Sequence, residues 1–138
     1  MDRLTRERRS WNMSRVRARD TKPELLVRSV LHRLGFRFTL HAHRLPGRPD
    51  IVLPRHRTVV LVHGCFWHRH HGCRFAYTPK SNVTFWISKF RQNVARDSQN
   101  KRELRRLGWR VVVVWECQTV DRAALAQRLA TALREVDG

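Results

Sequence analysis

Two uninterrupted apolar runs, TVVLV at 58–62 and RVVVVW at 110–115, constrain the fold of this chain more than any other feature. A strand with one face in water alternates apolar and polar residues, whereas these runs are apolar at nearly every position. Such runs are typical of strands that are covered on both faces. The two runs therefore predict an α/β protein with a central sheet between helices.

Further elements surround these two runs. The segment TKPELLVRSVLHRLG at 21–35 predicts a helix, because Thr21 and Glu24 fit a capping box and Gly35 suits the stop. Its expected apolar face carries Leu26, Val30 and Leu34. The other expected elements are strands at 36–40 and 50–53 and helices at 82–107 and 121–136.

The order α-β-β-β-α-β-α predicts a central mixed β-sheet flanked by helices on both sides. A chain of 138 residues is large enough for one hydrophobic core. We therefore expect a single domain at 21–138, preceded by a basic N-terminal segment at 1–20, which we interpret as an arm or a loosely held helix that becomes ordered on DNA.

The net charge indicates the kind of partner. The sequence has 29 Lys and Arg against 11 Asp and Glu, a formal charge of +18. Arginine makes up most of the excess, and its planar fork suits phosphates and base edges. This balance favours a nucleic-acid partner. The alternatives are an acidic protein partner, or a high-GC genome whose proteins are rich in arginine for reasons unrelated to binding.

The sequence also bounds the compartment. It has no apolar run of about 18 residues, so it predicts no membrane span, and its first residues lack the apolar stretch of a signal peptide. We expect a cytoplasmic protein, in which three cysteines are better explained by a metal or by free thiols than by disulfides.

Those three cysteines stand in a metal-ligand pattern. Cys65, His70 and Cys73 follow the first apolar run, and Cys117 follows the second. Three cysteines and a histidine form a closed tetrahedral set, which is typical of structural zinc. His71 is a rival to His70, and buried free cysteines beside solvated histidines are the alternative interpretation. Zinc here would fasten the ends of the two central strands together.

A second group of residues predicts phosphodiester chemistry. Asp50 stands at the start of an expected strand, where acids are disfavoured, and it is a candidate ligand for Mg²⁺. Hydrolysis also needs a base to activate water, and His68 lies in the Cys-His loop without being needed for zinc. The alternative for Asp50 is an ordinary Pro-Asp turn.

Two further acids are candidates for this site. Asp97 lies on the expected helix at 82–107, within an apolar stripe, where a carboxylate is costly unless it is paired or liganded. The residues of that stripe are Phe90, Val94, Asp97, Lys101 and Leu104. Asp97 could instead mark the edge of the stripe and pair with an arginine. Glu24 is explained by capping, and we keep it as a supporting acid.

Five stretches together resemble the very short patch repair endonucleases, which nick DNA beside a T:G mismatch. They are LPGRPD (45–50), HGCFWH (63–68), FW (85–86), NVARD (93–97) and LGWRVVVVWEC (107–117). The segment NMSRVRARDT (12–21) also resembles the approach to the family's first helix. The resemblance covers most of the chain in the same order. It implies a restriction-endonuclease-like fold and a Mg²⁺-dependent cut of one strand on the 5′ side of the mismatched T.

The resemblance also implies roles for individual residues. Asp50 and the backbone carbonyl of Val62, a threonine in the best-known member, would bind Mg²⁺. His68 would activate water, with His63 and Asp97 as supporting groups. The structural zinc ligands would be Cys65, His70, Cys73 and Cys117. The loop has one extra residue, Gly72, which keeps His71 open as an alternative ligand.

Aromatic residues would open the base stack beside the mismatch. The resemblance implies a wedge of Phe66, Trp67 and Trp86, met from the other groove by Met13 of the arm. Stacking offsets the cost of opening a base step, and a T:G wobble lowers that cost. Trp86 has a core position as its alternative.

Two other functions compete with mismatch nicking: a catalytically silent zinc domain that binds DNA, and a metal-dependent nuclease without mismatch preference. The family further implies a monomer that acts on double-stranded DNA at the bacterial nucleoid. It also implies a functional link to a cytosine-5 methyltransferase, because deaminated 5-methylcytosine produces T:G, and to general repair proteins.

Overall fold

A computed structural model describes residues 21–137 of the chain, and the predicted arm at 1–20, with Met13, lies outside the described residues. The helices and strands, in chain order, are α2 (Lys22–Arg33), β1 (Thr39–Leu40), β2 (Ile51–Leu53), β3 (Thr58–His63), α3 (Cys65–His68), α4 (Val83–Arg106), β4 (Arg110–Trp115) and α5 (Arg122–Asp137). Short 3-10 helices follow β2 (Pro54–His56) and β4 (Glu116–Thr119).

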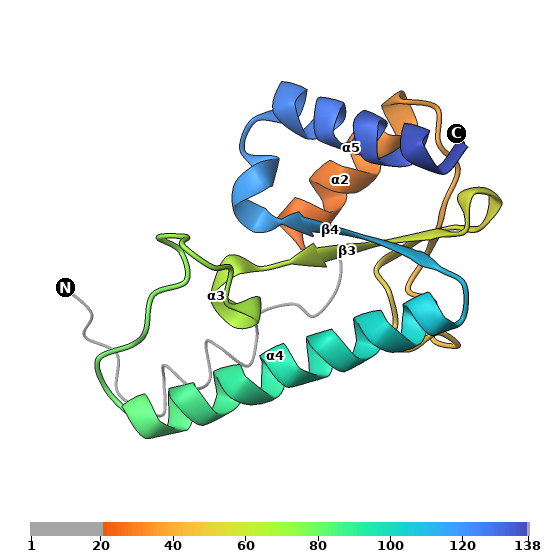
Figure 1. Ribbon diagram of the computed structural model, residues 1–138. Helices are drawn as coiled ribbons and strands as arrows, with labels where there is room; N and C mark the ends of the chain where they lie inside the picture. The colour runs from red at the N-terminus through yellow and green to blue at the C-terminus, as the bar shows by residue number, and fades with distance from the viewer. Residues whose placement is uncertain (1–20, 138) are drawn as a thin grey trace.

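The predicted mixed α/β architecture is confirmed. The four strands form one sheet in the order β1-β2-β3-β4, in which β3 and β4 are parallel and the other pairs are antiparallel. Figure 1 shows α2 and α5 on one face of this sheet and α4 along the other. The long connection through α3 and α4 carries the chain from β3 to its parallel neighbour β4, as a parallel pair requires.

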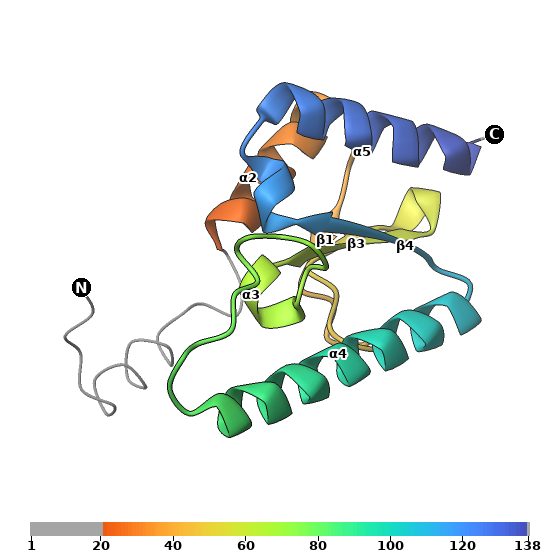
Figure 2. The same cartoon turned by 60° about the vertical axis from the view of Figure 1, so that its left-hand side comes forward.

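Alternate residues of the central strands pack on the two helical layers. On the side of α2 and α5, Ile51, Val60 and Val114 join the apolar faces of both helices in the larger core. On the opposite side, Val59 packs with Leu104 of α4. Burial on both faces explains why the run in β3 is continuously apolar. β4 lies at the edge of the described sheet, and its residues are half-buried except for the buried Val114. The turned view in Figure 2 shows the sheet between its two layers of helices.

The structure corrects one expected strand and one expected helix face. Only Thr39 and Leu40 of the predicted strand at 36–40 pair with β2, while Phe36 and Phe38 pack on the core. The apolar face of α2 is also shifted by about one residue. Leu34 is the C-cap and is 38% exposed, and the buried positions are Glu24, Val27, Val30 and Leu31.

The apolar stripe of α4 also differs from the predicted one. Val94 is 46% exposed, whereas Trp86, Phe90 and Leu104 are buried. A stripe of period 3.6 that begins at Trp86 passes through Asn93 rather than Val94 before it reaches the half-buried Asp97. The inward face of α4 is therefore apolar at both ends and polar in the middle.

A glycine allows the loop between β1 and β2 to approach that polar middle. Gly47 has a φ of +74°, and a Cβ there would lie 2.7 Å from Nδ2 of Asn100. Any side chain at this position would therefore be strained and would displace the side chain of Asn100. This contact holds the loop before Asp50 against the helix that carries Asp97.

Candidate active site and metal centre

A cavity of about 460 Å³ lies between the loop before β2, the end of β3 and α4. Its lining includes four of the acids and histidines that the sequence predicted for catalysis or for their support: Asp50, His63, His68 and Asp97. Val62 lines it as well, together with His41, His43, Arg48 and Asn100. Residues that are far apart in the sequence therefore share one solvent-accessible space.

Asp50 lies immediately before β2, and its carboxylate Oδ2 accepts a hydrogen bond of 3.0 Å from the backbone N–H of Val62 in β3. Burial raises the pKa of Asp50 from 3.8 to about 6, the Val62 hydrogen bond opposes this, and the charge of Glu24 adds to it. The site disfavours a carboxylate that has no cation. This is the electrostatic setting expected of a metal-binding carboxylate.

Glu24 makes contacts through its side chain as well as through its backbone at the start of α2. The hydroxyl of Thr21 accepts a hydrogen bond from the Glu24 N–H, as the sequence predicts for the start of α2. The Glu24 side chain is buried, lies 3.2 Å from Nη2 of Arg28 and 3.7 Å from Nε2 of His41, and shares a ligand-sized cluster with Asp50. Glu24 thus lies behind Asp50, on the side of α2.

His68 and Asp97 form the shortest polar contact of the cavity. Nδ1 of His68 lies 2.6 Å from Oδ2 of Asp97. His68 is the last residue of α3, and Asn93 of α4 donates a hydrogen bond of 3.1 Å to the carbonyl of Trp67, which fastens α3 to α4. Burial raises the pKa of Asp97, but the hydrogen bond and charge of His68 outweigh it and leave that pKa below its ordinary value.

The ring of His63 stacks on the ring of His68, with centroids 4.0 Å apart and planes 7° apart. His63 is buried, and its Nδ1 has no hydrogen-bond partner among the residues that the structure describes. Burial, followed by the charge of His68, lowers the pKa of His63 to about 3. His63 is therefore a neutral ring that supports His68 from the end of β3.

The predicted zinc ligands meet at the ends of β3 and β4. The ligand atoms of Cys65, His70, Cys73 and Cys117 all lie within 4.8 Å of one another. Nδ1 of His70 is 3.7 Å from Sγ of Cys65 and 3.4 Å from Sγ of Cys117. A tetrahedral zinc ion requires S···N separations of about 3.5 Å, so this donor set fits zinc in both chemistry and size.

The surroundings of the cluster distinguish the two candidate histidines. The ring of His70 stacks on Trp115 at the end of β4, with centroids 4.3 Å apart. His71 is exposed and is not part of the cluster. The structure therefore brings His70 to the cysteines. Glu116 adds a tie across the same junction, because its Oε1 accepts a 3.4 Å hydrogen bond from the Cys65 N–H.

The predicted wedge residues belong to one aromatic cluster, which comprises Phe66, Trp67, Tyr77, Trp86 and Phe90. Phe66 and Trp67 are half-buried, whereas Trp86 is only 8% exposed and packs against Phe90. The neighbouring Phe85 is 60% exposed. Without DNA, Trp86 thus occupies a core position, and its rearrangement would have to accompany any entry into the base stack.

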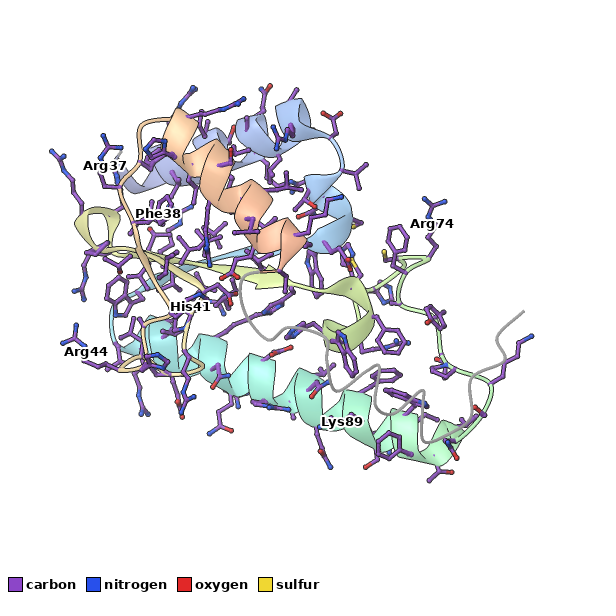
Figure 3. All side chains as sticks on the ribbon, turned by 180° about the vertical axis from the view of Figure 1, so that it is seen from behind. Arg37, Phe38, His41, Arg44, Arg74 and Lys89 are labelled. Carbon is purple, nitrogen blue, oxygen red and sulfur yellow. The ribbon has the colours of Figure 1, made fainter. Side chains whose placement is uncertain are left out.

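Sequence reasoning missed several residues of this region. His41 lies close to Glu24 and Asp50 with a positive φ of 50°, and Figure 3 shows it between α2 and α4. The HAH pair upstream of Asp50 was the available signal. Asn93 and Asn100 give no such signal, because polar residues on a long helix normally face water. The contacts of Arg69 with the carbonyls of Phe66 and Tyr77 were also missed, because the sequence does not indicate where its guanidinium points.

Comparisons with known proteins place this arrangement in a family. The sequence model for the DNA mismatch endonuclease Vsr matches residues 1–74. The chain is 51% identical over 132 residues to the type II nicking enzyme V.XorIIP of Xanthomonas oryzae, which covers 96% of each protein. It is 42% identical over 123 residues to the DNA mismatch endonuclease Vsr of Escherichia coli, which covers 89% of this chain and 78% of that protein.

The fold, the site and these relatives define a DNA endonuclease. The same family includes nicking enzymes such as V.NmeAIP of Neisseria meningitidis, to which the chain is 43% identical over 135 residues. The chain belongs to the DNA mismatch endonuclease Vsr family. Within the described residues, no helix is both long and apolar enough to cross a membrane.

Proposed function

We propose that this endonuclease nicks one DNA strand on the 5′ side of the T in a T:G mismatch, by Mg²⁺-dependent hydrolysis. One observation carries the chemical part of the proposal: the buried carboxylate of Asp50 and the His68–Asp97 pair line the same cavity. A carboxylate for a divalent ion and a base for water are the two groups that phosphodiester hydrolysis requires. Membership of the mismatch endonuclease family supports the choice of substrate.

Asp50 and the backbone carbonyl of Val62 would hold the Mg²⁺. The N–H and C=O of one strand residue project to the same side, and the Val62 N–H already points at Asp50. Both oxygens thus face the cavity, and hard oxygen donors suit Mg²⁺. When bound, the ion supplies polarisation of the scissile phosphate and neutralisation of the charge that develops on it. Glu24 would support the site from behind.

His68 would take the proton of the attacking water at Nε2. Asp97 accepts the Nδ1–H of the same ring, which fixes the tautomer and orientation of His68 and stabilises the imidazolium that forms. His63 keeps the ring in place by stacking and, with its pKa near 3, adds no competing positive charge. These three residues come from β3, α3 and α4, so the catalytic geometry depends on the packing of all three elements.

Zinc would have a structural role at Cys65, His70, Cys73 and Cys117. Three ligands belong to α3 and the loop after it, and the fourth follows β4. The ion would therefore fix α3, which carries the predicted base His68 and the wedge residues Phe66 and Trp67, to the end of the sheet. A set of four protein ligands leaves no open position for water, which separates this metal from the catalytic one.

Loss of one zinc ligand should expose that structural role. Cys117→Ser is expected to lower zinc content to well below one per chain and to lower the melting temperature, because structural zinc contributes directly to folding. Metal analysis and thermal unfolding measure both effects. His70→Ala should behave in the same way, while His71→Ala should keep its zinc. One tightly held zinc in Cys117→Ser would exclude Cys117 as an essential ligand.

Mismatch preference would come from Phe66, Trp67 and Trp86 entering the base stack, with Met13 of the arm opposite them. Phe66 and Trp67 lie on the same short helix as the predicted base, so opening the mismatched step would bring His68 to the adjacent phosphate. A T:G wobble is cheaper to open than a matched pair, and the wedge itself would therefore discriminate.

The wedge predicts a selective loss of binding. Trp67→Ala is expected to weaken binding to a T:G duplex by ~5–150-fold, the scale of one lost aromatic stack, and to affect a matched duplex less. Fluorescence anisotropy with both duplexes measures the difference. Phe66→Ala and Trp86→Ala should act alike without adding to it, because all three fill one gap. Equal losses on both duplexes, or unfolding, would assign Trp67 to the core.

A nicking assay tests the function as a whole. Duplexes that carry T:G, matched T:A or matched C:G at one position would be incubated with and without Mg²⁺, and the nicked strand would be mapped. We expect nicks only 5′ of the mismatched T, and only with the ion. Equal cutting of all duplexes would favour a nuclease without mismatch preference, and binding without cutting would favour a silent zinc domain.

The wider setting follows from the same proposal. The domain at 21–138 would have the restriction-endonuclease-like fold, and the basic arm at 1–20 would add phosphate contacts to the DNA. The protein would act as a monomer on chromosomal DNA at the bacterial nucleoid, in the cytoplasm. A cytosine-5 methyltransferase would create the sites that later deaminate to T:G, and general repair proteins would complete the repair.

A further inference from the structure

Arg69 connects three parts of the chain that meet around the aromatic cluster. Its Nη1 donates hydrogen bonds to the carbonyls of Phe66, at 3.3 Å, and Tyr77, at 2.9 Å. Its Nη2 donates to the carbonyl of Ala76, at 2.8 Å, and to the hydroxyl of Thr78, at 3.3 Å. The guanidinium therefore fastens the segment 76–78 to the helix α3.

The same guanidinium lies over the ring of Phe90 in α4. Its central carbon is 3.9 Å from the ring centroid of Phe90 and 5.8 Å from that of Phe66. Both rings belong to the aromatic cluster, and the ring of Tyr77, on the fastened segment, packs 5.0 Å from Phe66. One planar side chain thus sets the position of Phe66 relative to both Tyr77 and Phe90.

The three consecutive residues His68, Arg69 and His70 contact three different groups of side chains. His68 pairs with Asp97 in the cavity, Arg69 fastens the aromatic cluster, and His70 joins the cysteines. Arg69 has a left-handed backbone with a φ of 56°, which turns the chain between its two histidine neighbours. The turn lets each side chain leave in its own direction, so Arg69 contacts the aromatic cluster through interactions that differ from those of the predicted base and the zinc ligands.

We propose that Arg69 is a positioning residue for mismatch recognition. It holds the loop segment 76–78 and the ring of Phe66 in the arrangement that receives the opened base step, through contacts that are distinct from those of the zinc ligands. This inference rests on the proposed function, because it takes the aromatic cluster as the part that meets the mismatch. Arg69 has no part in the chemical step, which His68 and Asp97 perform on the other side of α3.

The arginine fork is essential to this role. Four acceptors lie within hydrogen-bond distance of the two terminal nitrogens, while the guanidinium carbon lies 3.9 Å from the ring centroid of Phe90. Lysine keeps the charge but offers one nitrogen without a plane, so it cannot reproduce both the fork and the stack. Glutamine removes the charge as well. The pair Arg69→Lys and Arg69→Gln therefore separates geometry from charge.

Arg74 provides a matched control on the same loop. It is exposed, its contact is with Phe75 outside the aromatic cluster, and Figure 3 shows it pointing away from the body of the protein. Arg74→Gln removes the same positive charge from the same loop as Arg69→Gln. Any effect that the two glutamine variants share is an effect of charge alone.

The test combines hydrogen exchange with binding and kinetics on the full chain. In both Arg69 variants, backbone amides of the segment 74–82 should exchange faster than in wild type, while zinc content stays at one per chain. The dissociation constant for a T:G duplex should rise about tenfold, within the range for a weakened base stack. The loss on a matched duplex should not exceed that of Arg74→Gln. The single-turnover nicking rate at saturating DNA should stay within about twofold of wild type.

Several outcomes would overturn the proposal. Unchanged exchange in 74–82 would show that Arg69 does not hold the segment, and equal losses on T:G and matched duplexes would reduce it to a surface charge. A large fall in the saturated rate would mean that it acts through His68. Unfolding or zinc loss in both Arg69 variants would assign it a purely structural role. If wild type itself shows no T:G preference, the proposed function fails, while the exchange result still decides whether Arg69 holds the loop.

Discussion

Asp50→Ala is expected to abolish nicking of a T:G duplex while the protein still binds that duplex. The carboxylate accepts a hydrogen bond from β3 and lines the cavity, and its removal takes away the side-chain oxygen that we propose as the Mg²⁺ ligand. Binding should persist because arginines and lysines supply the phosphate contacts. Nicking and gel-shift assays on the same preparation measure the two properties, and titration calorimetry with Mg²⁺ should show the loss of ion binding.

Asp121→Ala is a suitable control, because it removes an exposed acid at the start of α5 and should leave nicking intact. The contradicting result is Asp50→Ala activity within about tenfold of wild type, since loss of a catalytic metal ligand costs far more than that. The pH dependence gives an independent check. Because the pKa of Asp50 is about 6, protons compete with the ion below that pH, and Mg²⁺ affinity should fall as pH drops through 6.

The same carboxylate should cost the metal-free protein stability. Burial raises the pKa of Asp50 from 3.8 to about 6, so the folded state holds this proton more tightly than the unfolded state. The corresponding stability is fully present below pH 3.8 and is lost as pH rises through about 6. Asp50→Asn should therefore raise the free energy of unfolding at pH 7, without Mg²⁺, by up to about 3 kcal/mol. Denaturant titrations should show the gain shrinking toward pH 5.

His68→Ala is expected to slow nicking by roughly 10²–10⁴-fold, the range for a lost general base. Nε2 of His68 is the proposed proton acceptor, and the 2.6 Å contact between Nδ1 and Asp97 holds the ring in place. Single-turnover rates with saturating Mg²⁺ and T:G duplex measure the chemical step without interference from binding. DNA affinity should change little, because the ring faces the cavity rather than the aromatic cluster.

Two further variants test the same assignment: Asp97→Asn removes the partner of His68, and His71→Ala is the control. Asp97→Asn should also slow the reaction, because an amide can hold the ring in the wrong tautomer. His71→Ala removes an exposed histidine three positions away and should leave the rate unchanged. Full activity in His68→Ala would exclude it as the base and direct attention to His63. That result would be surprising, because the pKa of His63 near 3 makes it a weak proton acceptor.

The sequence predicted the fold well where the apolar pattern was strong. The strand at 110–115 has the expected bounds, and the long helix differs by one residue at each end, because both patterns run over many positions. The strand at 36–40 was too long because Phe36 and Phe38 are apolar for a different reason: they cover the core without pairing. A helix as short as α3 has no periodic pattern to find.

The candidate site was predicted better by residue type than by contact. The sequence itself shows cysteines and histidines at ligand spacing and an acid before an apolar strand. The zinc and Asp50 predictions could therefore be made without a structure. The stacking of His63 on His68, the tie from Asn93 to Trp67 and the fork of Arg69 depend on how α3 settles on α4. Side-chain directions across a loop of this kind are not encoded in any short motif.

The parallel pairing of β3 with β4 has a consequence for the protein during its synthesis. His63 lies opposite Trp115 in this ladder, and Cys117 follows two residues later, so the last strand of the described sheet and the fourth proposed zinc ligand leave the ribosome only after α3 and α4. Until then a nascent chain already carries Asp50, His68 and Asp97, but β3 is paired with β2 alone and its other edge has no partner strand. Chains are made at about 5–20 residues per second, which leaves such a fragment exposed for seconds. Because the proposed active site depends on the packing of β3, α3 and α4, we expect a chain that lacks β4 to show no nuclease activity.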